Sequence, residues 1–144
     1  MLNVVDYFKQ IIPEIAIDLV MEQVDNISRE DLKEVLDLAT LSSSTSFLVL
    51  WKDEEPIAFS YGNLSMGLES KGYYFWLNEF YVGKMHRNKG YGSYLFKCLK
   101  DKLKEMNVKY LALVTGKMNQ EAQIFYKKQG LNQKDYLWYD LNLN

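Results

Sequence analysis

Three residues near the middle of the chain, Arg87, Gly90 and Gly92, have types and a spacing that suit phosphate binding. They follow an apolar run, Phe75–Val82, and precede an amphipathic segment that begins within the glycines. A strand that leads through a glycine-rich turn into a helix N-terminus forms a cradle for phosphate oxygens, because its amides and the helix dipole attract anions. Glycine lets the backbone approach a ligand closely, since it lacks Cβ and tolerates positive φ. The spacing R-x-x-G-x-G therefore predicts an anion site at residues 87–92.

Better-known phosphate-binding motifs do not fit this segment. A Walker loop requires G-x-x-x-x-G-K-[ST], which occurs nowhere in the chain. A dinucleotide fingerprint requires G-x-G-x-x-G, but the third position after Gly92 is Leu95. On its own, R-x-x-G-x-G is also compatible with an ordinary turn before a helix, so a second segment has to support the assignment.

The second segment runs from Asn119 to Gly130 and follows another apolar run, Tyr110–Val114. Asn119, Ala122 and Tyr126 stand at i, i+3 and i+7, which places all three on one helical face. Gly130 stands where the C-terminus of a helix favours glycine. The pattern predicts a strand followed by a helix that presents a tyrosine.

The order strand, R-x-x-G-x-G turn, helix, strand, N-x-x-A-x-x-x-Y helix and glycine resembles the GNAT superfamily of acyl-CoA-dependent N-acetyltransferases. The resemblance covers about residues 72–131, the expected CoA-binding core. It implies a single α/β (α+β) domain over residues 1–144, with a mixed, twisted, mostly antiparallel sheet flanked by helices. It also implies transfer of an acetyl group from acetyl-CoA to a primary amine, by direct attack in a ternary complex.

The resemblance further implies roles for individual residues. Backbone amides of the turn would hold the CoA pyrophosphate, with the Arg87 guanidinium assisting, and Val82 would lie where the pantetheine arm inserts beside the strand. Asn119 matches the side chain that commonly contacts pantetheine, and Tyr126 the tyrosine that commonly protonates the departing thiolate. The expected cofactor-binding residues are Phe80, Tyr81, Val82, Arg87, Asn88, Lys89, Gly90, Tyr91, Gly92, Ser93, Asn119 and Tyr126.

Two of these residues also have a purely structural interpretation. Asn119 could be only a helix N-cap, a role that is compatible with a contact to pantetheine. Tyr126 could simply pack its ring, as most helical tyrosines do.

Glu79 is the only carboxylate in the strand Phe75–Val82, and a charge at such a position needs a reason. An amine must lose a proton before it attacks, and the resemblance implies an acidic base at or near this position. Other members of the superfamily place the base at the opposite strand parity, which here is Trp76 and Asn78. Because side chains alternate along a strand, Glu79 is either the catalytic base or a structural hydrogen-bond acceptor.

Composition agrees with a small soluble enzyme. The 144 residues suit one domain, and the single cysteine is compatible with a reducing cytosol, so a cytoplasmic location is expected. A net charge of −2 provides no basic field for nucleic acid, and no apolar run is long enough to span a membrane. No metal site is expected.

Hydrophobic periodicity predicts the remaining elements. Residues 4–22 have a helical pattern that Pro13 should kink or break, and Ser28-Arg-Glu-Asp31 has the form of a helix start leading to about Leu41. The other expected elements are a hairpin of Phe47–Trp51 with Pro56–Gly62, a loop over 63–72, and a last strand over Tyr136–Leu141.

Both ends of the chain depart from the usual layout of the superfamily. Met1–Val5 is barely long enough for a first strand, and only fourteen residues follow Gly130, where two strands are usual. A shortened sheet leaves an edge to be covered, so a homodimer is a reasonable hypothesis. Tyr136, Trp138 and Tyr139 would suit such an interface.

No motif identifies the acceptor. A small-molecule amine is expected, with a protein lysine or N-terminus as the alternative acceptor. A module that binds acyl-CoA without turnover is the remaining alternative, because a fold does not fix a function.

Overall fold

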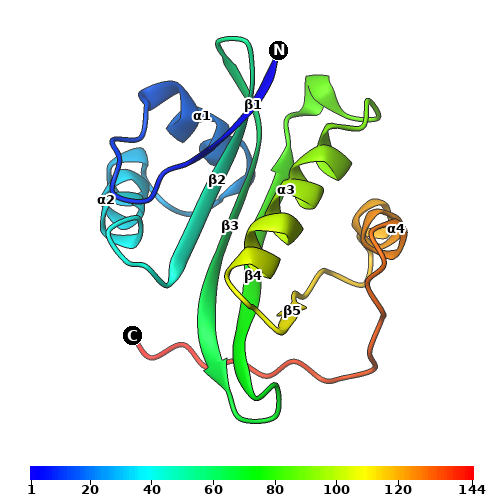
Figure 1. Ribbon diagram of the computed structural model, residues 1–144. Coiled ribbons are helices and arrows are strands. Elements are labelled where there is room, and N and C mark those ends of the chain that lie inside the picture. Colours follow the sequence, from blue (N-terminus) through cyan, green and yellow to red (C-terminus); the bar gives the residue numbers. More distant parts are fainter. The chain divides into compact units, whose positions relative to one another are not determined.

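The computed structural model describes residues 1–144, which form two compact units, Met1–Val114 and Thr115–Asn144 (Figure 1). The first unit contains β1 (Leu2–Asp6), α1 (Glu14–Gln23), α2 (Arg29–Ala39), β2 (Thr45–Lys52), β3 (Glu55–Gly67), β4 (Gly72–Val82), the 3₁₀ turn η1 (Lys84–His86), α3 (Tyr91–Glu105) and β5 (Tyr110–Ala112). The second unit contains α4 (Gln120–Lys128).

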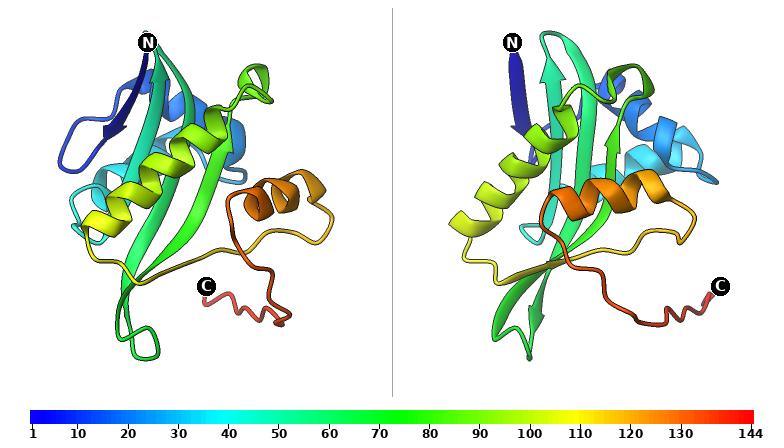
Figure 2. Two further views of the ribbon diagram at one scale, coloured as in Figure 1. Left: turned by 45° about the vertical axis from the view of Figure 1, so that its right-hand side comes forward. Right: turned by 90° about the vertical axis from the view of Figure 1, so that its right-hand side faces the viewer.

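The five strands form one sheet in the order β1-β2-β3-β4-β5. The first three pairings are antiparallel, whereas β4 and β5 are parallel and are joined through the crossover helix α3. Figure 2 shows α1 and α2 on one face of the sheet and α3 on the other. This mixed, mostly antiparallel α/β arrangement confirms the predicted fold class.

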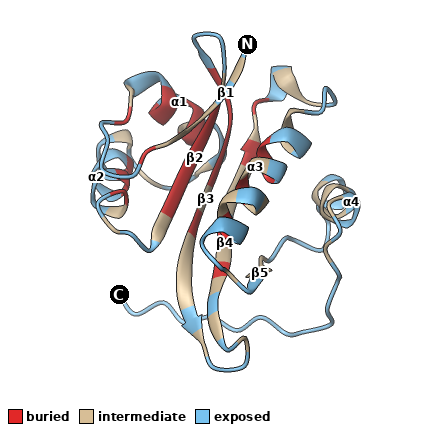
Figure 3. Ribbon diagram, in the orientation of Figure 1, coloured by how far each residue is buried: buried red, intermediate tan, exposed pale blue.

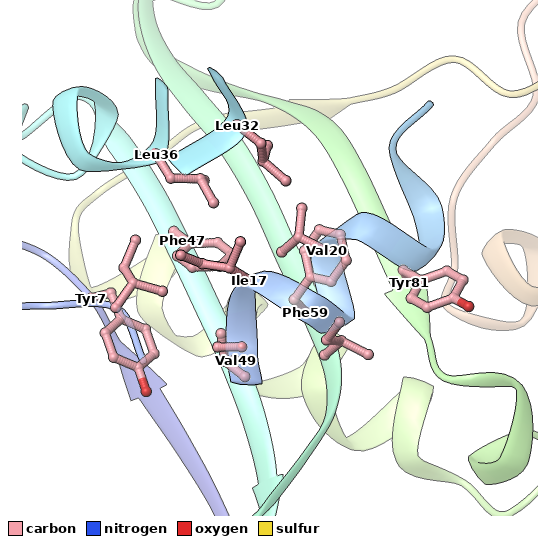
Figure 4. Close-up of a cluster of buried hydrophobic side chains, with 12 residues drawn as sticks. Tyr7, Ile17, Val20, Leu32, Leu36, Phe47, Val49, Phe59 and Tyr81 are labelled. Carbon is pink, nitrogen blue, oxygen red and sulfur yellow. The ribbon is translucent and has the colours of Figure 1, made fainter. Parts of the chain in front are cut away.

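The main hydrophobic core lies between the sheet and the helices α1 and α2 (Figure 4). Phe47 of β2 and Phe59 of β3 pack edge to face, with ring centroids 6.1 Å apart. Ile17 of α1 and Leu36 of α2 are buried in the same cluster. Figure 3 shows the buried residues concentrated in β2 and in the first half of β3. On the other face, α3 buries one stripe, consisting of Leu95, Phe96, Leu99 and Leu103.

The prediction that the chain begins with a helical segment is wrong. Residues 2–6 form β1, which pairs with β2, and Pro13 is the N-cap of α1 rather than a kink within a helix. The apolar residues before Pro13 mimic a helical period, but sheet pairing satisfies the backbone of residues 2–6 instead. The second helix begins as predicted, because the Ser28 side chain accepts a hydrogen bond from the Asp31 amide at 3.1 Å.

The predicted loop over 63–72 is also wrong. β3 continues to Gly67 and β4 starts at Gly72, so these residues form a long hairpin with a short turn. Within it, Tyr61 pairs with Glu79 and Gly62 with Leu77, which leaves Asn78 as the extra residue of a β-bulge. A Cβ on Gly62 would overlap the Phe75 ring and lie 2.5 Å from the Trp76 carbonyl oxygen, so only glycine fits opposite the bulge.

The predicted last strand, Tyr136–Leu141, is absent. Residues 131–144 have no regular secondary structure, and most of their side chains are exposed. β-Propensity alone does not make a strand without a partner edge. None of the helices is both long enough and apolar enough to span a membrane.

Candidate active site

The turn between β4 and α3 is anchored at several points in the first unit. The Gly83 amide donates to the Ile57 carbonyl at 2.8 Å, and the His86 amide donates to the Gly83 carbonyl at 2.9 Å. The His86 ring lies 3.1 Å from Glu55 Oε1 at the start of β3. These bonds fix the backbone that leads into Gly90, where α3 begins.

The N-terminus of α3 is open in a way that suits an anion. Gly90 is the N-cap, has a left-handed φ of 85° and gives no side-chain cap, and the first turn carries no acidic residue. Apart from the adjoining residues of the chain, no atom lies within 4 Å of where a Gly90 Cβ would be. The first intrahelical bond, from the Tyr94 amide to the Gly90 carbonyl, is 3.0 Å long, so the amides of Tyr91 and Gly92 precede the helical ladder. The helix dipole adds attraction for negative charge.

The other expected residues of this turn have different surroundings. Asn88 has a left-handed φ of 60°, and the Lys89 ammonium donates to the Met85 carbonyl at 3.2 Å. Ser93 lies in the first turn of α3 and is exposed. The Tyr91 ring contacts the His86 ring, with a centroid distance of 6.3 Å, which ties the helix start to the turn.

Arg87 folds back onto the end of β4. Its Nε donates to the Val82 carbonyl oxygen at 3.0 Å, and its guanidinium carbon lies 5.3 Å from the centre of the Tyr81 ring. The guanidinium carries five N–H donors in all, so a contact with one carbonyl does not exhaust its capacity to bind an anion. The Arg87 side chain thus links the turn to the end of β4, and its positive charge lies next to the turn.

β4 extends well past its partner on one side. β5 pairs only with Tyr74–Trp76, and β4 continues to Val82. Successive side chains at this end point to opposite faces, because Phe80 packs on Phe96 of α3 at 5.7 Å whereas Tyr81 belongs to the α1/α2 core. The strand therefore ends just before the turn that leads into α3, with an edge that β5 does not cover.

The bulge at Asn78 resolves the question of strand parity for Glu79. Glu79 pairs with Tyr61, which packs on Phe47 of the α1/α2 core at 6.4 Å, so Glu79 shares that face. Asn78 Oδ1 accepts a hydrogen bond of 3.0 Å from Asn63, two residues along β3 from Tyr61. Both neighbouring side chains consequently project to the same face of the sheet.

Glu79 lies in an environment that shifts the pKa of its carboxyl group. It is half-buried, and burial raises the pKa of its carboxyl group above the ordinary value, while a hydrogen bond from Gln23 works in the opposite direction. The Gln23 Nε2 to Glu79 Oε2 distance is 3.5 Å, and it joins the last turn of α1 to β4. Sequence reasoning missed Gln23, because no local pattern marks a contact over 56 residues.

Asn119 and Tyr126 belong to the second unit. The Asn119 side chain caps α4 by accepting from the Ala122 amide at 3.1 Å, which confirms the structural role predicted for it. Tyr126 is half-buried and its ring lies 5.3 Å from that of Phe125. The helix ends in a Schellman motif, with Leu131 and Gly130 amides donating to the Tyr126 and Lys127 carbonyls.

The candidate residues thus fall into two groups. The turn residues, Glu79 and the end of β4 come together in the first unit, on and around the end of one strand. In the second unit, Asn119 is the N-cap of α4 and Tyr126 lies within that helix, seven positions further along the chain.

The family model for acetyltransferases of the GNAT family matches residues 13–131. This match begins at Pro13, the N-cap of α1, and ends just after α4, so it includes both groups of candidate residues. No curated protein sequence matches the chain significantly.

Solved structures share the fold over nearly the whole chain. An aminoglycoside N-acetyltransferase in complex with CoA superposes with a TM-score of 0.84 at 9% identity, covering 100% of this chain and 96% of that one. Glucosamine-6-phosphate N-acetyltransferase from Arabidopsis thaliana gives 0.75 at 15% identity, with 98% of both chains covered. Ribosomal-protein-alanine N-acetyltransferase from Brucella melitensis biovar Abortus 2308 gives 0.75 at 15% identity, covering 99% and 100%. At these identities, the similarity establishes the fold.

Proposed function

The chain belongs to the acetyltransferase (GNAT) family, and from this premise we propose that it transfers an acetyl group from acetyl-CoA to a primary amine. The observation that carries the proposal is the open N-terminus of α3, which lies directly after a strand whose end β5 does not cover. A family match over residues 13–131 supports treating the chain as one acetyltransferase domain with its CoA-binding core at 72–131.

The residues of the turn fit the anionic part of CoA. Amides of Tyr91 and Gly92, the space beside Gly90 and the remaining N–H groups of Arg87 would hold the pyrophosphate. The end of β4 near Val82 offers a strand edge to the amide groups of the pantetheine arm. For Asn119 of the second unit, the proposed role is a contact with pantetheine.

The chemistry requires one proton to leave the amine and one to reach the sulfur. Acetyl-CoA supplies the activated thioester carbonyl when bound. Glu79 accepts a proton from the amine, directly or through water, as the new C–N bond forms. Tyr126 donates its phenolic proton to the sulfur as the C–S bond breaks. Holding both reactants in one site removes most of the entropic cost of their encounter.

We propose a small-molecule amine as the acceptor. The named neighbours include enzymes for both small molecules and a ribosomal protein, so fold gives no preference between them. The alternatives are a protein lysine or N-terminus, and a module that binds acyl-CoA without turnover.

The decisive experiment is a panel of amines assayed with acetyl-CoA by release of the free thiol. The panel contains amino sugars, polyamines, amino acids and peptides with free N-termini or lysines. Turnover with a small amine supports the proposal, whereas turnover with peptides alone supports the protein alternative. Tight CoA binding without thiol release for any amine would support the alternative of a module that binds acyl-CoA without turnover.

Two variants in the same assay test the assigned roles. Gly90→Val should weaken CoA binding in calorimetry by at least tenfold, because the side chain fills the cradle and strains a left-handed residue. Gly130→Val is the matched control, because Gly130 also has a left-handed φ and open space around it, and CoA affinity should stay unchanged in this variant.

Tyr126→Phe keeps the ring but loses the phenolic proton, so kcat should fall by about 10- to 1,000-fold with little change in KM for acetyl-CoA. An undiminished kcat would make Tyr126 a packing residue.

A further inference from the structure

Tyr81 links the candidate CoA site to the last turn of α1. Tyr81 is only 5% exposed, and its hydroxyl lies at the border of the core cluster (Figure 4). That hydroxyl donates to Glu22 Oε1 at 3.0 Å, across 59 positions of the chain. Burial raises the pKa of Tyr81 and the Glu22 carboxylate raises it further, whereas the nearby Arg87 lowers it, and the net effect keeps the phenol protonated as the donor.

Arg87 occupies the face of the same ring. Its guanidinium carbon lies 5.3 Å from the Tyr81 ring centroid, within the range of a cation–π contact. The Nε bond of 3.0 Å to the Val82 carbonyl supplies a second, directional contact. A ring face and a carbonyl together restrict both the position of the guanidinium and the orientation of its plane.

We propose that Glu22 and Tyr81 are positioning residues that hold the Arg87 side chain in place for the pyrophosphate of CoA, an inference that rests on the proposed function. The carboxylate that accepts from the phenol increases the negative potential of the ring, which strengthens its attraction for the guanidinium. An arginine that is already ordered loses less conformational entropy when it binds an anion. Glu22 thereby acts on an anion site that it does not line.

The test uses Tyr81→Phe and Glu22→Ala, with Tyr7→Phe as the matched control. Tyr7 is also 5% exposed, belongs to the same core cluster and makes one side-chain hydrogen bond, accepted from Trp51 Nε1 at 3.1 Å. It lies on the opposite side of the cluster from Tyr81 in Figure 4. Both tyrosine variants lose one hydroxyl from the core, but only one should affect the turn.

The expected result is a rise of about 3- to 10-fold in Kd for CoA, by calorimetry, for both Tyr81→Phe and Glu22→Ala, which corresponds to one lost hydrogen bond. KM for acetyl-CoA should rise in parallel, with kcat within about twofold of the parent. Tyr7→Phe should lower Tm comparably and leave CoA affinity unchanged. The double variant Glu22→Ala/Tyr81→Phe should bind CoA as the single variants do, because the two residues act as one unit.

Unchanged CoA affinity in Glu22→Ala would overturn the inference, and this exposed position keeps the test valid even where Tyr81→Phe folds poorly. Equal weakening in Tyr7→Phe would also overturn it, because the effect would then be a general loss of stability. In both cases, loss of binding in Gly90→Val would leave the proposed function intact. Absence of CoA binding by the unaltered protein would reject both.

Discussion

The charged carboxylate of Glu79 should support activity but lower the stability of the fold. Its pKa is raised by burial, so the folded protein binds this proton more tightly than the unfolded chain does. The charged carboxylate therefore destabilises the fold at pH above the raised value, and the penalty disappears below the ordinary value of 4.5. Glu79→Gln should lower kcat/KM yet raise Tm at pH 7 by about 1–3 °C, a small gain because the group is half exposed.

The pH dependence provides the control for this prediction. The Tm difference between the two proteins should vanish as pH falls below 4.5, where the parent carboxyl is neutral. The acidic limb of kcat/KM should flatten or move in the Gln variant, measured with one acceptor of known pKa, because that amine also titrates. A lower Tm at pH 7 with an unchanged rate would identify Glu79 as a structural hydrogen-bond acceptor.

Local spacing was sufficient to predict that some candidate residues stand at helix ends, and it could not reveal the long-range contacts of others. Gly90 and Asn119 stand out because a helix start and a helix cap are decided within a few positions of the chain. Glu22 and Gln23 carry no local signal, because their contacts with Tyr81 and Glu79 span 59 and 56 positions. The orientation of Glu79 depended on a bulge, which shifts strand parity without any mark in a simple apolar pattern.

The C-terminus of α3 contains a strained residue whose replacement should stabilise the protein. Asn107 stands at the C′ position with a φ of 58°, and the Val108 amide completes a Schellman motif by donating to the Leu103 carbonyl at 2.9 Å. Asn107→Gly should raise the free energy of unfolding by about 0.5–1 kcal/mol, because glycine adopts this conformation without strain. Asn107→Ala should lower it, since a Cβ is disfavoured there. Chemical denaturation measures both, and an equal effect of the two substitutions would exclude conformational strain as the cause.

The elements differ in how far sequence predicts them. α2 and α3 carry strong apolar stripes and clear starts, and both lie where the patterns indicate. The sequence pattern does not reveal β1, because its apolar residues fit the helical spacing of the residues that follow. Pairing with β2, which is distant in the chain, decides its conformation. The outer part of the β3–β4 hairpin contains glycines that favour a loop, but its ladder extends to the pair Gly67 and Gly72.

The segment after α4 is rich in large apolar and aromatic side chains, yet these side chains are exposed. Tyr136 is 85% exposed and Tyr139 is 82% exposed. The hypothesis of a homodimer through this segment predicts that the full chain elutes as a dimer in size exclusion with light scattering. A chain lacking residues 132–144 should then elute as a monomer. A monomeric full chain would reject the hypothesis.

Gly62 has a consequence for how this sequence can vary over evolutionary time. A larger residue at this position meets two obstacles, the Phe75 ring and the Trp76 carbonyl oxygen. A smaller residue at 75 would remove the first obstacle, but the second belongs to the backbone and stays whatever the side chains are. Among descendants that keep the bulge, position 62 should therefore be fixed as glycine rather than co-vary with position 75, and loss of that glycine should accompany loss of the bulge itself.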